Sequence, residues 1–225
     1  MRAPVLAADA GSLIWWDWVD RHYDDIWQRT LEHLRLAGLA LLIGFAISMV
    51  LALVALRFRR TYAPITWVTG ILYTIPSLAL FAFLVPITGL GTLTAEIGLV
   101  GYTLLILVRN IVAGVDGVPG SVKEAADGMG YTSWRRVASV DLRLATPTII
   151  AGLRIAAVTT IGLVTITALV GAGGYGVLID DGLSRRFNTP IVVGAALSVF
   201  MAVAFDVVLL GAERALTPWA RRRRP

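Results

Sequence analysis

Residues Leu36–Leu56, LAGLALLIGFAISMVLALVAL, form an uncharged run of 21 residues between Arg35 and Arg57. An α-helix rises about 1.5 Å per residue, so this run reaches about 30 Å, the thickness of the hydrocarbon core of a bilayer. The stretch therefore predicts a transmembrane helix at about residues 35–56. It indicates that the fold is organised by a membrane.

The composition of the whole chain agrees with a membrane protein. Of its 225 residues, 57% are hydrophobic and 16% are charged, and the mean hydropathy is +0.75. Soluble domains average roughly 25% charged residues. Cysteine is absent, which excludes disulfides, thiolate metal sites and cysteine nucleophiles. We place both histidines, His22 and His33, outside the apolar core, so we expect no metal centre and no cofactor.

Four further spans follow from the remaining apolar runs. The 35 uncharged residues Thr61–Ala95 reach about 52 Å as one helix, which is too short for two spans. We place one span there at about 64–85, kinked at Pro76, with a span plus a re-entrant segment as the alternative. The others lie at about 93–115, 146–169 and 190–211. The expected fold class is all-α, a polytopic membrane protein with about five transmembrane helices.

The distribution of charge predicts the orientation. With five spans, one side holds the first loop, the segment 116–145 and the C-terminus. That side carries 14 of the 20 basic residues and 6 of the 15 acidic ones. An excess of Lys and Arg marks the cytoplasmic side, so we expect the N-terminus outside and the C-terminus inside.

Three regions follow from this topology. Residues 1–29, rich in Trp, Tyr and Asp, form an outer interfacial segment, and residues 30–211 form the membrane domain. Residues 212–225 form a basic cytoplasmic tail. Its arginines Arg221–Arg224 stand beside a span, so anionic lipid headgroups are their expected partner and nucleic acid is not.

The segment 116–145 is the one long polar stretch between spans. Ser121 and Glu124 have the spacing of a capping box, which predicts a helix that runs to Met129 and ends at a left-handed Gly130. A second short helix is expected from Thr132 or Ser133. The first helix has one apolar stripe, and this stripe either packs on its own domain or docks in a groove of another subunit. The stripe consists of Val122, Ala125, Ala126 and Met129.

The same segment resembles the EAA loop of ABC-importer permeases. The residues that carry the resemblance are Glu124-Ala125-Ala126, then Gly130, then Val140-x-Leu142. In that family the loop forms the coupling helix that docks on the cytoplasmic ATPase subunit. The resemblance thus implies a coupling role for a set of five residues. They are Glu124, Ala125, Ala126, Met129 and Gly130. The family motif ends in Leu-Pro, whereas Arg143 stands at that position here.

Further motifs resemble permeases of the glycine betaine, carnitine and choline importers over about residues 30–211. The motifs are Thr30-Leu-Glu-His33-Leu, Tyr73-Thr-Ile-Pro76-Ser, Val108-Arg-Asn110, Pro147-x3-Ala151-Gly-Leu-Arg154 and Gly171-Ala-Gly-Gly174-Tyr-Gly176. The resemblance implies a fold like that of type I ABC importer permeases. It also implies a cytoplasmic ATPase, a second permease chain (a copy or a sister chain) and an extracytoplasmic substrate-binding protein.

Nucleotide chemistry is not expected in this chain. Gly171–Gly176 matches the pattern G-x-G-x-x-G, but it follows an apolar span and no acidic residue stands about 20 positions later. We interpret it as a tight outer loop. A P-loop requires Gly-Lys, whereas the only lysine, Lys123, follows Val122. The chain is therefore not an enzyme by this reading, and ATP hydrolysis falls to a partner.

Two sets of residues inside the spans are candidates for function. Arg154 and Asp206 lie at similar depth, so we expect them to pair or share a polar network, with snorkelling to the interface as the alternative. Aromatic faces bind quaternary ammonium groups. The candidate pathway residues are Tyr73, Pro76, Ser77, Phe81 and Tyr102. For any one of the three aromatic residues, ordinary helix packing is favoured over a pathway role.

The sequence thus predicts the permease subunit of an ABC importer for a small quaternary ammonium osmoprotectant. Three alternatives stay open. The same architecture could import another small solute, such as an amino acid. The chain could be a channel or scaffold without an ATPase partner. An intramembrane enzyme is the third, although the spans offer no nucleophile–base pair.

Overall fold

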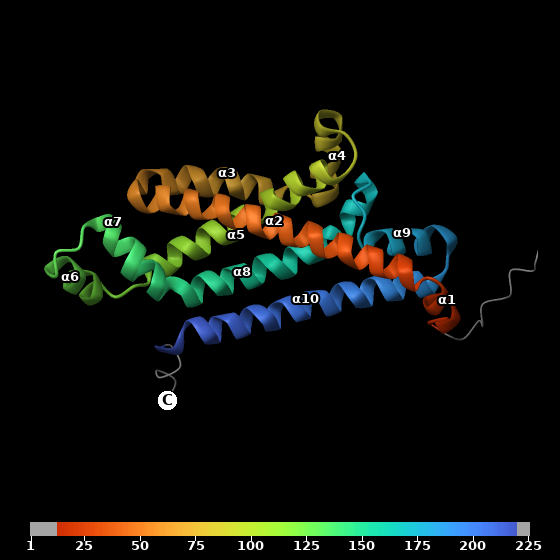
Figure 1. Ribbon diagram of the computed structural model, residues 1–225. Helices are drawn as coiled ribbons and strands as arrows, with labels where there is room; N and C mark the ends of the chain where they lie inside the picture. The colour runs from red at the N-terminus through yellow and green to blue at the C-terminus, as the bar shows by residue number, and fades with distance from the viewer. Residues whose placement is uncertain (1–12, 220–225) are drawn as a thin grey trace, which may run out of the picture.

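The computed structural model describes residues 13–219, so the N-terminal residues 1–12 and the basic tail Arg221–Arg224 lie outside the described part. Long helices lie side by side in one elongated bundle (Figure 1). In chain order the elements are α1 (Trp16–Arg21), α2 (Tyr23–Arg57), the 3₁₀ turn η1 (Arg59–Thr61), α3 (Tyr62–Thr74), α4 (Ser77–Thr88), α5 (Thr92–Asp116), α6 (Gly120–Gly128), α7 (Ser133–Arg136), the π-helical turn η2 (Val137–Asp141), α8 (Leu142–Val164), the 3₁₀ turn η3 (Ile166–Val170), α9 (Gly176–Arg185) and α10 (Asn188–Leu216).

Within residues 13–219, four continuous helical stretches are long and apolar enough to cross a membrane. They are Tyr23–Arg57, Thr92–Asp116, Ser133–Val164 and Asn188–Leu216. The pair α3 and α4 adds a fifth candidate if the two count as one broken span. The all-α class with about five spans is therefore confirmed. The first long helix starts at Tyr23, well before the expected residue 35, because the aromatic and acidic segment before the apolar run is itself helical.

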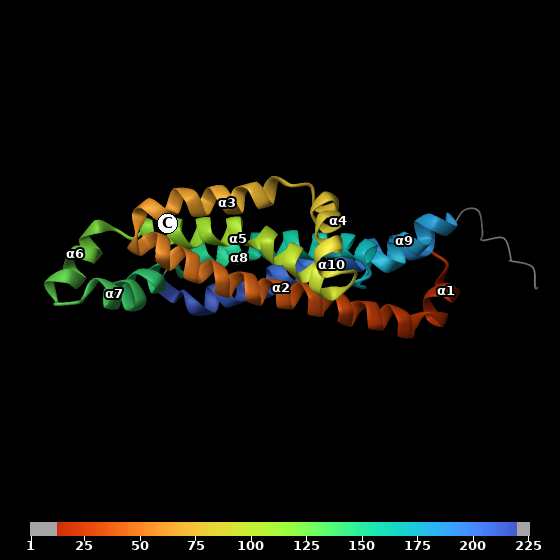
Figure 2. The ribbon, with the colours of Figure 1, turned by 90° about the horizontal axis from the view of Figure 1, so that it is seen from above.

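The single kinked helix expected at 64–85 is wrong. The chain bends by 98° between α3 and α4, and α4 turns out from the bundle (Figure 2). Pro76 disfavours the helical conformation at the residue before it, and Ile75 is accordingly extended, with ψ at 128°. At 13 and 12 residues, α3 and α4 are each too short to span alone.

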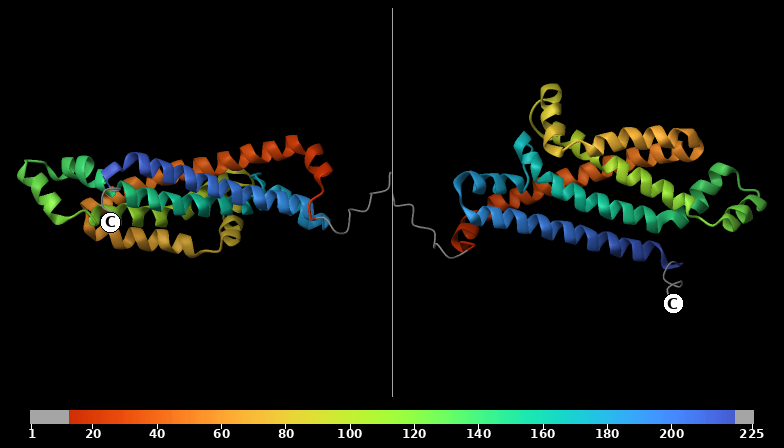
Figure 3. Two further views of the ribbon diagram at one scale, coloured as in Figure 1. Left: turned by 90° about the horizontal axis from the view of Figure 1, so that it is seen from below. Right: turned by 180° about the vertical axis from the view of Figure 1, so that it is seen from behind.

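The centre of the bundle is formed by α2, α5 and α8, with α10 beside α8 and α3 at the opposite edge (Figure 3). Glycines allow the central helices to approach closely, as is usual between membrane helices. A Cβ on Gly44 would stand 2.0 Å from Thr103 Oγ1, and one on Gly152 would stand 2.4 Å from Asn110 Cβ. The contacts of α5 with its neighbours thus depend on the absence of a side chain at these two positions.

Large apolar side chains are exposed along the outside of the bundle. Trp67 on α3, Phe83 on α4 and Phe200 on α10 are each at least 70% exposed. A surface of this kind suits lipid or another membrane-embedded chain as its surroundings.

Candidate functional site

Helix α6 and the short α7 project from one end of the bundle, the end at which α10 finishes (Figure 1). Ala126 is buried, whereas Glu124 and Ala125 are exposed and Met129 is 70% exposed. The predicted apolar stripe is thus divided between two surroundings. Ala126 packs inward and Val122 is half-buried, whereas Ala125 and Met129 face outward.

The expected capping box does not form. Helix α6 begins at Gly120, one residue before Ser121, and no side chain caps its first turn. Pro119 takes the extended N-cap position with ψ at 137°, and its carbonyl accepts from the N–H groups of Val122 and Lys123. Pro119 thus sets the start of α6 in place of a serine cap. Ser121 lies within the first turn of the helix.

The expected end of α6 and start of α7 agree with the structure, with a shift of one residue. Helix α6 ends at Gly128, with Met129 as its C-cap, and Gly130 then takes the left-handed conformation with φ at +79°. The backbone N–H of Tyr131 donates to the Ala126 carbonyl at 3.1 Å. Thr132 caps α7 by accepting from the Arg135 N–H.

Sequence reasoning missed three charged residues in this segment. Arg136 on α7 donates to Asp127 on α6 at 2.5 Å, and its Nε stands 3.5 Å from the buried Asp141. A groove of about 640 Å³ runs between α7 and the end of α2, where Arg57 and Trp134 line it. The sequence gives little indication of these contacts. Asp141 and Asp127 stand five and nine positions from Arg136, and neither spacing is that of a pair within one α-helix.

Arg154 and Asp206 lie together in the bundle, with Arg154 near the middle of α8. The Arg154 guanidinium on α8 donates from Nε and Nη2 to the two carboxylate oxygens of Asp206 on α10, at 2.7 and 2.8 Å. Glu213, two turns further along α10, approaches Arg154 Nη1 at 3.8 Å. The paired fork geometry orients both side chains and joins α8 to α10.

Four of the five candidate pathway residues surround the break between α3 and α4. Tyr73 meets Tyr102 edge to face at 6.0 Å between ring centroids, and the Tyr102 hydroxyl donates to the Ile75 carbonyl, freed by the break. Pro76 and Ser77 form the break itself. An irregular backbone at membrane depth needs such an internal partner.

Phe81, the fifth candidate, lies in the core. Its side chain is fully buried, and a Cβ on Gly98 would stand 2.4 Å from its ring. Phe81 therefore serves the packing of α4 on α5 in this structure.

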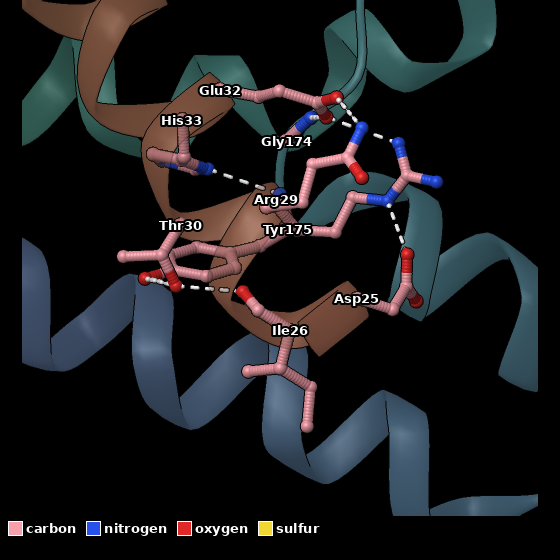
Figure 4. A network of polar contacts seen from close by, with 9 residues as sticks. Asp25, Ile26, Arg29, Thr30, Glu32, His33, Gly174 and Tyr175 are labelled. Atoms are coloured by element: carbon pink, nitrogen blue, oxygen red, sulfur yellow. Dashed lines mark hydrogen bonds and ion pairs between the residues drawn. The ribbon is translucent and has the colours of Figure 1, made fainter. Parts of the chain in front are cut away.

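A second polar network, at the opposite end from α6, joins α2 to the glycine-rich loop (Figure 4). The Glu32 carboxylate accepts from the Gly174 N–H at 2.9 Å and from Arg29 at 3.0 Å. Gly173 and Gly174 both have positive φ, and a Cβ on Gly173 would stand 2.4 Å from Glu32 Oε2. The glycines thus let the loop backbone approach the Glu32 carboxylate closely.

His33 belongs to the same network and corrects the expectation that it lies outside the core. Its side chain is fully buried. Nε2 donates to the Ile161 carbonyl at 3.1 Å, and Nδ1 accepts from the Tyr175 N–H at 3.3 Å. The Tyr175 ring packs on the imidazole and its hydroxyl hydrogen-bonds Thr30. Within residues 13–219, His, Asp and Glu side chains form no cluster of three or more that could hold a metal ion.

Substituting Glu32 tests whether this network fixes the loop. Glu32→Ala leaves the Gly174 N–H without its partner, which costs about 1–3 kcal/mol. We expect the midpoint of thermal unfolding of the purified protein in detergent to fall by several degrees. Gln28→Ala is the matched control, because Gln28 makes only one exposed hydrogen bond to the same carboxylate at 3.2 Å. Equal midpoints for the two variants would contradict a fixing role for Glu32.

Comparison with solved structures supports the fold. An inward-facing structure of the MetNI methionine ABC transporter superposes with a TM-score of 0.75, at 20% identity, over 85% of this chain and 96% of that one. An amino acid ABC transporter crystallised with histidines superposes with a TM-score of 0.72, at 19% identity, over 90% and 99% of the two chains. The fold is therefore that of the type I ABC transporter permeases, as expected.

Sequence relatives cover most of the chain. The choline transport system permease protein OpuBB of Bacillus subtilis is 34% identical over 195 residues, which is 87% of this chain and 90% of that protein. The osmoprotectant import permease protein OsmW of Salmonella typhimurium is 34% identical over 194 residues, 84% of this chain and 90% of that protein. Residues 44–222 also match a family profile. With the bundle, the broken span and the projecting α6, these matches show that the chain belongs to the family described as binding-protein-dependent transport system inner membrane components.

Proposed function

We propose that this chain is the membrane-spanning subunit of an ABC importer and that it forms the path for a quaternary ammonium osmoprotectant such as glycine betaine, choline or carnitine. The observation that carries the proposal is the exposed surface of α6 in a member of this family. Glu124 and Ala125 face outward there, and Met129 is 70% exposed. The substrate class rests on the names of the relatives, which are choline, carnitine and osmoprotectant permeases.

The proposed mechanism assigns ATP hydrolysis to a separate cytoplasmic subunit. That subunit docks on α6, with Glu124, Ala125, Ala126, Met129 and Gly130 as the coupling set. ATP-driven closure of the ATPase moves α6, and α8 carries the movement into the bundle. A second permease chain completes the path, and an extracytoplasmic binding protein delivers the solute. In this proposal residues 30–211 form the permease domain, with the basic tail anchored on lipid.

The pathway residues fit a weak and transient contact. Tyr73 is 38% exposed and stands edge to face with Tyr102 beside the break. A cation over such a ring gains about 0.5–2 kcal/mol, which suffices for guidance but permits release. We assign the stronger selection of the solute to the binding protein.

The proposed orientation places the α6 end in the cytoplasm and the N-terminus outside. The absence of cysteine makes the test simple, since one introduced cysteine is the only target of a thiol reagent. Ser121 on α6 and Ser184 on α9 are both exposed and stand at opposite ends of the chain's bundle. In intact cells an impermeant reagent should label Ser184→Cys and spare Ser121→Cys; the reverse pattern would overturn the orientation.

Affinity purification from the native membrane tests the function. We expect the tagged permease to retain an ATPase subunit after mild detergent extraction, and to capture a binding protein when the solute is present. A permease that elutes without any ATPase would instead be a channel or scaffold. Glu124→Lys in parallel shows whether the retained ATPase depends on α6.

A further inference from the structure

Asp141 is a buried carboxylate with incomplete pairing. It ends the π-helical turn η2 and is the N-cap of α8, and its side chain is 2% exposed. Its Oδ1 is buried without a hydrogen-bond partner among the described residues. A buried carboxylate in this condition is costly unless a cation satisfies it. The structure therefore holds an acceptor that a small rearrangement could satisfy.

A donor without a hydrogen-bond partner among the described residues stands beside the other oxygen of the same carboxylate. Arg136 Nε is also buried without a hydrogen-bond partner among residues 13–219, and it lies 3.5 Å from Asp141 Oδ2. An N–H···O hydrogen bond has a length of about 2.9 Å, so the two groups are separated by about 0.6 Å more than a bond requires. The same guanidinium also contacts a second carboxylate, from Nη1 to Asp127 Oδ2 at 2.5 Å.

The two carboxylates differ in position and in surroundings. Asp127 lies on α6 with its side chain 50% exposed, whereas Asp141 is buried where η2 joins α8. Exposed ion pairs contribute little, and a pair shielded from water interacts more strongly. Single π-helical turns are frequent at functional sites. Arg136 thus connects a surface ion pair on α6 to a shielded carboxylate at the start of a membrane helix.

We propose that Arg136 is an exchangeable link between the coupling segment and α8. When α6 is drawn away by its ATPase, Arg136 leaves Asp127 and closes on Asp141, which fixes η2 against the first turn of α8. The groove beside Arg136, lined by Arg57 and Trp134, gives the guanidinium room to turn. Arg136 acts here as a positioning residue. This inference rests on the proposed function, because it requires that α6 binds the ATPase.

The exchange predicts effects of opposite sign for the two carboxylates. Asp127→Asn releases Arg136 toward Asp141, so ATP hydrolysis by the assembled importer without binding protein should rise by about twofold to fivefold, the range that an exposed pair controls. Asp141→Asn removes the destination, so hydrolysis stimulated by binding protein and glycine betaine should fall by about tenfold or more. In an Arg136→Gln background, neither change should have a further effect.

The assay uses the full importer in liposomes, and retained ATPase is measured for every variant. Arg135→Gln is the matched control, since its guanidinium stacks on Tyr131 at 4.6 Å and should leave both rates at the wild-type value. Asp127→Asn is an exposed substitution that keeps the fold, so its result stands even if Asp141→Asn fails to assemble. Equal signs for the two variants, or additive effects with Arg136→Gln, would overturn the exchange. If Glu124→Lys retains its ATPase in the same experiment, the docking of the ATPase on α6 is wrong, and a wild-type permease that retains no ATPase would instead contradict the proposed function itself.

Discussion

Solute uptake should fall to the level of cells without the permease when Glu124 is replaced by lysine, while the protein still inserts in the membrane. Glu124 is exposed on α6, so reversing its charge disturbs no internal contact of the bundle. The substitution therefore changes only the surface of α6 on which the ATPase is proposed to dock. Gly130→Val should have the same outcome, because a β-branched residue is strained at the φ of +79° that ends α6.

Ser121→Ala is the matched control for these two variants. Ser121 lies on the same helix, and its side chain forms no cap in the structure. Uptake by Ser121→Ala should equal that of the wild type, and a loss as large as that of Glu124→Lys would show that the capping box forms after all. Uptake at the normal rate in both Glu124→Lys and Gly130→Val would contradict the coupling role of α6.

Removing either charge of the Arg154–Asp206 pair should reduce transport by about tenfold or more, because the two charged hydrogen bonds that join α8 to α10 are lost. Without Asp206, Arg154 keeps only the longer contact with Glu213 at 3.8 Å. The exchange of both residues, Arg154→Asp with Asp206→Arg, should recover part of the loss, since the fork can form in the opposite direction. Labelled-solute uptake in a double-mutant cycle measures this coupling.

The control for the pair is a surface ion pair of similar chemistry. Arg185 and Asp181 form an i,i+4 pair on α9, and the Arg185 side chain is 72% exposed. Arg185→Met should leave transport unchanged, as most exposed pairs contribute little. If Arg154→Met and Asp206→Asn are each as silent as Arg185→Met, the pair has no role and snorkelling explains the two charges.

The apolar runs predicted most of the membrane helices. They did not predict the break at Pro76 or the residue that caps α6. A run of uncharged residues indicates that a helix is there, but the backbone conformation at Ile75 decides whether Pro76 kinks the helix or breaks it. Here the Tyr102 hydroxyl satisfies the freed carbonyl of Ile75, 27 positions away, and so permits a complete break. Likewise, the Ser121 pattern predicted a serine N-cap for α6, whereas Pro119 is the N-cap residue in the structure.

The polar contacts differed in how far they could be predicted. Arg154 and Asp206 stood out because a charge inside an apolar span requires a partner, and few candidates exist. The contact of Glu32 with Gly174 joins positions 142 apart, and nothing in either local sequence specifies the other. His33 was placed outside the core for the same reason, since its partners Ile161 and Tyr175 come from elements that only the fold brings near.

Uptake of labelled glycine betaine and choline, in cells with and without this gene at high osmolarity, tests the central proposal most directly. The proposed function predicts that accumulation of at least one of the two compounds depends on the gene and is lost in the Glu124→Lys variant. Accumulation of both compounds at equal rates in the two strains, while uptake of an amino acid depends on the gene, would contradict the osmoprotectant assignment.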